Sequence, residues 1–598
     1  MSEYRAPLKD MQFLLHEVFQ VEALWSQLPE LAELIDKDTA NAILAEGAKL
    51  TAEVIAPLNR NSDEQGAVWH DGEVTTPDGF KKAYQLYCDG GWGALSGDAD
   101  FGGMGMPKML QGAFEEMTQS ASISFALYPM LTAGACLALA AHASTAMKST
   151  YLEKMYSGIW SGTMCLTEPH SGSDLGIMTS KAQDNGDDSF SISGTKIFIT
   201  GGEHDLTENI IHLVLAKIPG APAGPRGISM FVVPKFLVNS DGRLGARNTL
   251  ACGSIEHKMG IKGSATSVMN FDGAKGYLVG EQNKGLNYMF TMMNYERLGM
   301  GIQGIGAAEV SYQQAAAYAH DRIQGRSAIA SQRTDKVADP LIVHADVRRM
   351  LLTMRSLNEA GRCFSTYVAK QLDIVKFSES VEDKNKAEQL VALLTPVAKA
   401  FLTDMSYDNC GLGQMVFGGH GYIREWGQEQ LVRDVRIAQI YEGTNGIQAF
   451  DLLGRKVVAS KGQLFSTYQN EISQFIKTHQ DNEALTDFIK PLQQSLVKLD
   501  ELTQLLLTNS QQDKNLVGAS ATDYLAVFGY VSYSYMWAMM AEKSITKIKQ
   551  DDFYQAKLYV GKFYMQRLLP RVDSHIQAIL AGSEPLMAMP AALFGYEE

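Results

Sequence analysis

The stretch Phe190-Ser-Ile-Ser-Gly-Thr-Lys-Ile-Phe-Ile-Thr200 alternates in hydrophobicity along its length and stops at Gly201-Gly202. Such a period of two is typical of a β-strand that buries one face. Further short strands, bounded by Gly, Pro and Asp, are expected at 210–217, 227–234, 254–259 and 267–272. Together these segments predict a compact β domain of roughly 120 residues.

Helical periodicity dominates on both sides of this β domain. It is found over 40–58, 80–88, 108–119 and 145–157, and again over 286–319, 345–372, 385–417 and 432–440. A further block predicts helices over 464–478, 484–508, 519–548 and 553–580. The order of helices, then strands, then helices excludes a βαβ series and predicts an α+β fold. We expect an N-terminal extension (1–37), an N-terminal helical domain (38–160), a middle β domain (161–280), a C-terminal helical bundle (281–456) and an additional C-terminal helical domain (457–598).

Composition excludes several classes of protein. The 598 residues carry a formal net charge of -15, which disfavours binding to nucleic acid or to anionic lipid. The six cysteines are scattered, which predicts buried free thiols in a reducing compartment, and the N-terminal residues lack the layout of a secretory signal. The most apolar stretch, 123–141, holds Pro129 and predicts a buried core helix, so no integral membrane segment is expected. His170 and His420 show no metal-ligand spacing, so we expect no metal site.

Two motifs belong to the predicted β domain. Cys165-Leu-Thr-Glu-Pro-His-Ser-Gly-Ser-Asp174 places small residues and hydroxyls at a strand end, where they offer donors to a polar ring edge or simply form a turn. In Lys196-Ile-Phe-Ile-Thr200 the aromatic and the hydroxyl residue are two apart, so they lie on one face of the strand. That face meets either a planar cofactor or the ordinary protein core.

A third motif lies in the later helical region: Gly418-Gly-His-Gly-Tyr422 is followed by Gln439-Ile-Tyr-Glu-Gly-Thr-Asn-Gly-Ile-Gln448. A helix that ends at Gly443-Thr444 places Glu442 at its terminus. That carboxylate is either a general base, if partial burial raises its pKa, or a solvated residue at a helix cap. Gly299-Met-Gly-Ile-Gln-Gly304 matches a dinucleotide-binding fingerprint, but its surroundings are helical, which predicts close helix packing instead.

Taken together, these motifs resemble those of the acyl-CoA dehydrogenase family over residues 40 to 455, and the chain's length is similar to that of a larger bacterial branch. The resemblance implies FAD as cofactor, α,β-dehydrogenation of an acyl-CoA to the trans-2-enoyl-CoA, and flavin N5 as hydride acceptor. Implied substrates are 3-(methylthio)propionyl-CoA or a medium- or long-chain acyl-CoA. It also implies a role in β-oxidation, an electron-transfer flavoprotein as acceptor, a homodimer or higher homo-oligomer, and a cytoplasmic location, either free or peripheral to a membrane.

The resemblance also implies roles for single residues. Glu442 takes the place of the catalytic base, and its backbone N–H takes the place of an oxyanion donor. The FAD contacts fall on Thr167, Gly172, Ser173, Phe198, Thr200, Arg322, Gly418, Gly419 and Thr444, with Arg322 reaching a neighbouring subunit's FAD. The substrate contacts fall on Ser173, Arg297 and Tyr441.

Three departures from the family pattern leave alternatives open. Some members carry the base at the position of Glu296, so this residue is an alternative to Glu442. The family's R-x-x-F-G reads Arg322-Ile-Gln-Gly-Arg326, and an expected Gln is Met415, with Gln414 one position early. An acyl-CoA oxidase, a DNA-associated flavoprotein on the same scaffold and an inactive scaffold are the alternative functions; an intact Glu442 argues against the last.

Overall fold

The computed structural model describes residues 4–329 and 334–595, which form two compact units. The sheet unit comprises Tyr4–Ala6 and Ala45–Gly299, and the helical unit comprises Pro7–Leu44 and Met300–Glu598. Helices α4 (Lys37–Leu50) and α10 (Gly285–Asp321) contribute residues to both units. The predicted α+β class is confirmed.

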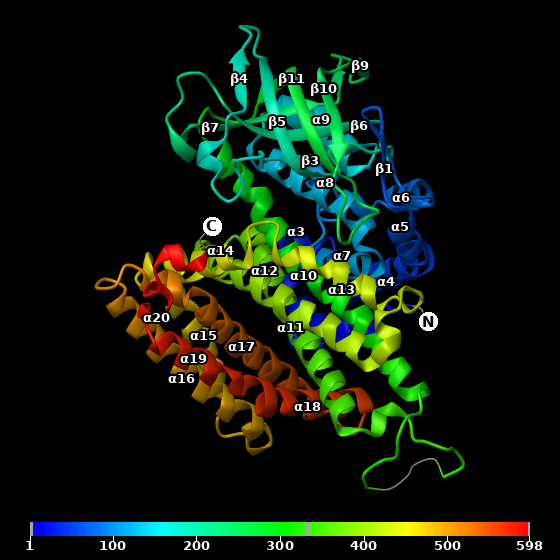
Figure 1. The fold of residues 1–598 in the computed structure, drawn as a ribbon, viewed down its shortest axis with the longest axis vertical. Helices are drawn as coiled ribbons and strands as arrows, with labels where there is room; N and C mark the ends of the chain where they lie inside the picture. The colour runs from blue at the N-terminus through cyan, green and yellow to red at the C-terminus, as the bar shows by residue number, and fades with distance from the viewer. Residues whose placement is uncertain (1–3, 330–333, 596–598) are drawn as a thin grey trace. The chain divides into compact units, whose positions relative to one another are not determined.

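The sheet unit is built around a seven-stranded sheet whose pairings close on themselves (Figure 1). Strands β11, β5, β4, β6 and β7 pair in a ring, and β10 and β3 are added at β11 and β6. The apolar faces of these strands meet inside the ring, as the alternating sequence requires. The strands are β3 (Trp160–Cys165), β4 (Lys181–Asp184), β5 (Phe190–Thr200), β6 (Asn209–Lys217), β7 (Ile228–Pro234), β10 (Leu250–Ile255) and β11 (Thr266–Leu278). Shorter pairs are β1 (Val68–His70) with β2 (Glu73–Thr75), and β8 (Phe236–Val238) with β9 (Leu244–Arg247).

One strand differs from the expectation. The strand predicted at 254–259 is β10, which begins at Leu250 and ends at Ile255. Leu250 and Cys252 are its buried residues and pair with β11, whereas the chain leaves the sheet after Ile255. The sequence pattern is ambiguous here because Gly253 interrupts the alternation.

In the sheet unit, one helix comes before the short hairpin of β1 and β2, and four helices come after it. They are α5 (Asn59–Gln65), α6 (Phe80–Asp89), α7 (Lys108–Ala121), α8 (Ile123–His142) and α9 (Thr145–Tyr156). Ser122 begins α8, because its side chain accepts a hydrogen bond from the N–H of Phe125. Within the described residues α8 alone is long and apolar enough to span a membrane, but 83% of its most apolar window is buried in the protein. It is a core helix, as expected for 123–141.

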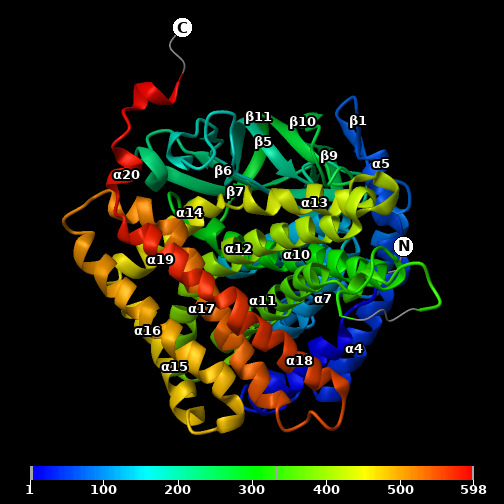
Figure 2. The same cartoon turned by 60° about the horizontal axis from the view of Figure 1, so that its bottom comes forward.

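Long antiparallel helices make up the helical unit. Figure 1 shows α11, α12 and α13 beside the end of α10, and Figure 2 shows α16, α17 and α19 as a layer that contacts α11 through α17. The helices are α1 (Leu8–Gln12), α2 (Val21–Trp25), α3 (Pro29–Ala32), α11 (Ala345–Phe377), α12 (Val381–Phe417), α13 (Gln428–Arg436), α14 (Asn445–Phe450), α15 (Gln463–His479), α16 (Thr486–Asn509), α17 (Leu516–Ser544), α18 (Asp552–Phe563), α19 (Val572–Leu580) and α20 (Glu584–Met587).

Two expectations about these helices can be compared with the structure. The fingerprint at 299–304 lies within α10, which confirms helix packing rather than dinucleotide binding. There, Gly301 lies so close to α12 that an added Cβ would be 2.3 Å from the carbonyl oxygen of Ala398. The helix expected over 553–580 is helical throughout but is not one regular α-helix: a π-helix (Tyr564–Leu568) and a 3-10 helix (Leu569–Arg571) separate α18 from α19. Pro570 lies in the 3-10 helix and lacks the N–H that a continuous α-helix needs.

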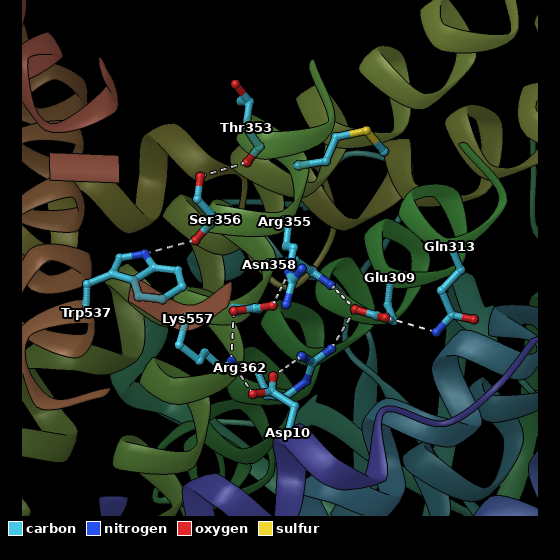
Figure 3. A network of polar contacts seen from close by, with 12 residues as sticks. Asp10, Glu309, Gln313, Thr353, Arg355, Ser356, Asn358, Arg362, Trp537 and Lys557 are labelled. Atoms are coloured by element: carbon cyan, nitrogen blue, oxygen red, sulfur yellow. Dashed lines mark hydrogen bonds and ion pairs between the residues drawn. The ribbon is translucent and has the colours of Figure 1, made fainter. Parts of the chain in front are cut away.

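A buried charge cluster ties α1 to the end of the helical unit (Figure 3). Asp10 pairs with Arg362 of α11 at 2.5 Å and with Lys557 of α18, and Lys557 also pairs with Glu359 at 2.8 Å. Arg362 reaches Glu309 of α10 at 2.8 Å. Although burial opposes the charged form, Lys557 and Arg362 hold the pKa of Asp10 below its usual range. Positive and negative groups therefore compensate one another in a site that would not tolerate a lone charge.

All six cysteines are free thiols, as expected. Five are buried and Cys88 is half-buried. Burial raises the pKa of the Cys88 thiol to about 11, which keeps it protonated at neutral pH.

Candidate functional site

The predicted site residues fall in both units. In the sheet unit, Phe198 is an aromatic side chain that is 59% exposed although it lies on a central strand. Its φ is +60°, a conformation that is rare for a bulky residue. The pairing of β5 with β11 shifts register at this point, so a β-bulge turns Phe198 outward while Ile199 stays buried.

The loop after β3 is fastened to the strand that carries Phe198. The N–H of Ile197 donates to the carbonyl of Thr167 at 2.9 Å, and the hydroxyl of Thr163 donates to the carbonyl of Thr200 at 2.6 Å. Thr167 is therefore held next to Ile197, the neighbour of Phe198, and Thr200 is held two residues after Phe198; both threonines are half-buried. Gly172 and Ser173 are exposed, and an added Cβ on Gly172 would have no neighbour within 4 Å.

A buried ion pair lies beneath this loop. Lys196 Nζ is 2.9 Å from Glu168 Oε1 and donates also to the carbonyl of Leu166 at 2.9 Å. The second carboxylate oxygen accepts from the N–H of Thr179 at 2.7 Å, and Ser180 N–H donates to Oε1 at 3.0 Å. Despite burial, the charge of Lys196 and these hydrogen bonds lower the pKa of Glu168 to about 2. The pair was missed in the sequence, although a lysine at a core-facing position of an apolar strand is a signal for it.

Arg297 and Glu296 lie on the part of α10 that belongs to the sheet unit. Arg297 is half-buried and donates to Asn294 Oδ1 at 3.2 Å. Glu296, the alternative base, is only 1% exposed. Its Oε1 lies 2.4 Å from the place that a Cβ on Gly134 would take, so the carboxylate occupies space on α8 that only glycine leaves.

In the helical unit, Glu442 lies in the turn between a short 3-10 segment (Ile437–Gln439) and α14. Its φ is +55° and that of Gly443 is +80°, so two successive residues are left-handed. The predicted helix end at this position is instead a turn that leads into a new helix, with Thr444 as its N-cap. Glu442 is half-buried, and its carbonyl accepts from Gln448 Nε2 at 3.0 Å. Tyr441 donates its hydroxyl hydrogen to Gln303 of α10.

The remaining predicted FAD residues of this unit are exposed. Gly418 has φ of +60° and follows α12, and neither Gly418 nor Gly419 would meet another atom within 4 Å through an added Cβ. Thr444 and Arg322 are also exposed. Gln414 donates to the carbonyl of Gly421 at 3.1 Å, whereas Met415 is 67% exposed, because one residue along a helix turns the side chain by about 100°. Within 4–329 and 334–595 no group of three or more metal-ligating side chains is found.

Comparisons with known proteins cover nearly the whole chain. Family models match at 37–159 (acyl-CoA dehydrogenase, N-terminal domain), 163–274 (acyl-CoA dehydrogenase, middle domain), 283–457 (acyl-CoA dehydrogenase, C-terminal domain) and 468–590 (acetyl-CoA dehydrogenase C-terminal like).

Full-length relatives agree with these matches. The 3-methylmercaptopropionyl-CoA dehydrogenase of Ruegeria pomeroyi is 41% identical over 98% of this chain and 99% of that protein. The broad-specificity linear acyl-CoA dehydrogenase FadE5 of Mycobacterium tuberculosis is 32% identical over 99% of this chain and 100% of that protein. The solved structure of an acyl-CoA dehydrogenase complexed with FAD from Bacillus anthracis shares the fold, with a TM-score of 0.74 and 20% identity over 92% of this chain and 89% of that one.

The extra helices after residue 457 are therefore shared with whole relatives rather than added to this chain alone. The chain belongs to the acyl-CoA dehydrogenase family, whose members are FAD-dependent oxidoreductases acting on acyl-CoA thioesters.

Proposed function

We propose that this enzyme converts an acyl-CoA to its trans-2-enoyl-CoA, with Glu442 as the base that removes the α-proton. The observation that carries this assignment is the conformation of Glu442, a left-handed residue fixed in a turn. Strained backbone of this kind costs on the order of 1–3 kcal/mol and persists where neighbouring groups enforce it. Glu442 is also the more accessible of the two candidates, since the carboxylate of Glu296 is packed against Gly134.

The residues of the sheet unit fit a flavin. Phe198 offers an exposed aromatic face, Thr167 and Thr200 offer hydroxyl groups beside it, and Gly172 leaves open backbone for a bulky group. In the helical unit, Gly418, Gly419, Thr444 and Arg322 are the residues proposed to complete FAD binding. When bound, FAD accepts the β-hydrogen of the substrate with its electron pair.

The residues of the chain itself do the rest. The Glu442 carboxylate takes the α-proton, and the backbone N–H of Glu442 donates to the thioester oxygen as negative charge grows there. Ser173, Arg297 and Tyr441 are the proposed substrate contacts. Electrons leave to an electron-transfer flavoprotein, in a cytoplasmic homodimer or larger homo-oligomer that serves β-oxidation.

The proposed substrate is 3-(methylthio)propionyl-CoA, because the 41% identical relative is named for that thioester and matches over its whole length. A second candidate class, linear medium- or long-chain acyl-CoA, is favoured by the 32% identity to the broad-specificity enzyme.

The charge pattern does not favour the DNA-associated alternative. Lys543 lies 2.9 Å from Glu542, Lys547 lies 3.0 Å from Glu17, and Lys557 is buried beside Asp10 and Glu359. These three cations are already neutralised by the chain itself, and the exposed Lys549 is followed closely by Asp551 and Asp552, so the charge pattern of this region is mixed.

An anaerobic titration tests the proposal. The FAD-loaded enzyme is mixed with 3-(methylthio)propionyl-CoA, with pentanoyl-CoA (its equivalent with CH₂ in place of sulfur) and with longer acyl-CoAs, and the flavin absorbance is followed in the wild type, Glu442→Gln and Glu296→Gln. We expect bleaching in the wild type, fastest with the thioether, and about 10²–10⁴-fold slower bleaching in Glu442→Gln. Full speed in Glu442→Gln would refute the base, and no bleaching with any thioester would refute the reaction.

A further inference from the structure

The turn that carries Glu442 is fastened to α12 on both of its sides. Asp404 Oδ1 accepts from Gln439 Nε2 at 2.6 Å and from Asn445 Nδ2 at 2.7 Å. These two partners lie three residues before and three residues after Glu442. One carboxylate oxygen therefore joins the beginning and the end of the turn.

Asn445 is bonded at both ends of its amide. Besides Asp404, its Nδ2 donates to the hydroxyl of Thr403 at 2.9 Å and to the carbonyl of Ala400 at 3.1 Å. Its Oδ1 accepts from Lys399 Nζ at 2.7 Å. All four partners come from residues 399–404 of α12, and Lys399 and Thr403 are completely buried.

The side chain at position 445 must be an amide, because it lies between the charges of Lys399 and Asp404. The oxygen of Asn445 faces a cation and its nitrogen faces an anion, so each hydrogen bond is charge-assisted. An aspartate at this position would repel Asp404, and an alanine would leave both charges without the amide. Burial raises the pKa of Asp404, against the opposing effect of its hydrogen bonds to Gln439 and Asn445.

The rest of the turn has few regular backbone hydrogen bonds to impose its shape. The N–H groups of Ile440 and Tyr441 both donate to the carbonyl of Ile437, and α14 resumes only after Thr444. The left-handed pair of Glu442 and Gly443 therefore depends on side-chain contacts, and α12 supplies those that reach both ends of the turn.

We propose that Asp404 and Asn445 are positioning residues that fix the direction of the Glu442 carboxylate by clamping both ends of its turn to α12. The inference rests on the proposed role of Glu442 as base. Asp404 and Asn445 would then affect the proton transfer without touching the substrate.

The test compares Asp404→Ala with the conservative Asp404→Asn, which keeps an oxygen that can accept both hydrogen bonds. In FAD-loaded enzyme, we expect Asp404→Ala to slow flavin reduction by thioester about tenfold to hundredfold, because small misplacement of a reacting group has effects of that size. KM and the flavin content should change less than threefold, and Asp404→Asn should recover most of the rate. Glu388→Ala, which removes an exposed carboxylate nearer the start of α12, is the matched control.

The decisive readout is additivity with Glu442→Gln. If the clamp acts through Glu442, Asp404→Ala has no further effect in the Glu442→Gln background. If Glu442→Gln reduces at the wild-type rate, the proposed function fails, whereas a slow Glu442→Gln beside a fast Asp404→Ala overturns the positioning role alone. Should Asp404→Ala fail to fold, Gln439→Leu breaks one side of the clamp and must still slow reduction; an unchanged rate there overturns the proposal.

Discussion

Phe198 in the sheet unit and Glu442 in the helical unit are both left-handed candidate residues, but the chain holds them by different means. Phe198 lies in a bulge between two hydrogen-bonded strands, two residues after Lys196, which forms a buried ion pair with Glu168. Glu442 lies in a turn without such a ladder, and side-chain amides and Asp404 hold it. Backbone hydrogen bonds between strands fix the orientation of Phe198, whereas side-chain hydrogen bonds fix that of Glu442. Mutations at the two places should therefore differ in what they destroy.

The largest effect is expected at the ion pair. Lys196→Met leaves Glu168 buried without its cation, which should lower the free energy of unfolding by about 3–5 kcal/mol and reduce the FAD retained per chain. Urea unfolding and the flavin absorbance of the purified protein measure the two effects. Lys181→Met, at an exposed position on β4, is the control and should stay within about 0.5 kcal/mol of the wild type.

A double variant that removes the charges of both Lys196 and Glu168 separates the effect of charge from that of shape. Lys196→Met combined with Glu168→Leu should be more stable than Lys196→Met alone, because no lone charge remains. If the double variant is as unstable as the sum of both single variants, the pair contributes through shape and not through charge.

Low pH should weaken the ion pair between Lys196 and Glu168 without any mutation. The pKa of Glu168 is about 2 in the folded chain against an ordinary 4.5, so its stabilisation is complete above pH 4.5 and is lost as the pH falls toward 2. The complete loss would amount to about 3 kcal/mol, of which about 2 kcal/mol is expected by pH 3. Unfolding measured from pH 6 to pH 3 should show a steeper decline for the wild type than for Glu168→Gln, and parallel curves would contradict the assignment.

Relief of backbone strain should change the stability by a smaller amount, and by a similar amount at Glu442 and at Phe198. At a left-handed position glycine avoids the Cβ clash, so Glu442→Gly should be more stable than Glu442→Ala by about 1–2 kcal/mol, and Phe198→Gly more stable than Phe198→Ala. Thermal unfolding of the four variants measures the difference. At Ile447, which lies in α14, the order should reverse because glycine disfavours a helix.

The smallest effect is expected from a single hydroxyl. Tyr441→Phe removes the donor to the buried oxygen of Gln303 and should cost about 1 kcal/mol of stability, since one neutral hydrogen bond is lost. Flavin reduction should slow by less than the loss expected for Asp404→Ala. A larger slowing by Tyr441→Phe would mean that this hydroxyl, at the substrate or through Gln303, matters more to the reaction than the contacts of Asp404.

The sequence was sufficient for the α+β order and for most long helices, because their hydrophobic periods are continuous. It did not reveal the β-bulge at Phe198, since an aromatic residue in an alternating strand looks the same with or without one. The π-helix at Tyr564–Leu568 was equally hidden, although Pro570 beside it was a readable sign.

At the site, Glu442 could be found by its motif, but not the groups that hold it. Asp404 and Asn445 are 41 residues apart, and their contact depends on the register of α12 against the turn. A charged residue inside an apolar helical run, as Lys399 is, was the available indication. Gln414 and Met415 are neighbours on a helix, and hydrophobic periodicity does not locate a helix face to a single residue. The sequence therefore could not tell which of the two faces inward.

The cluster around Asp10 also sets an order of events during synthesis. Asp10 and Lys557 are 547 residues apart in the sequence, so at ordinary translation rates roughly 30–110 s separate their emergence from the ribosome. Arg362 and Glu359 become available in between, with their charges only partly matched. The first helix of the chain therefore gains its last ionic partner only when nearly all of the protein has been made.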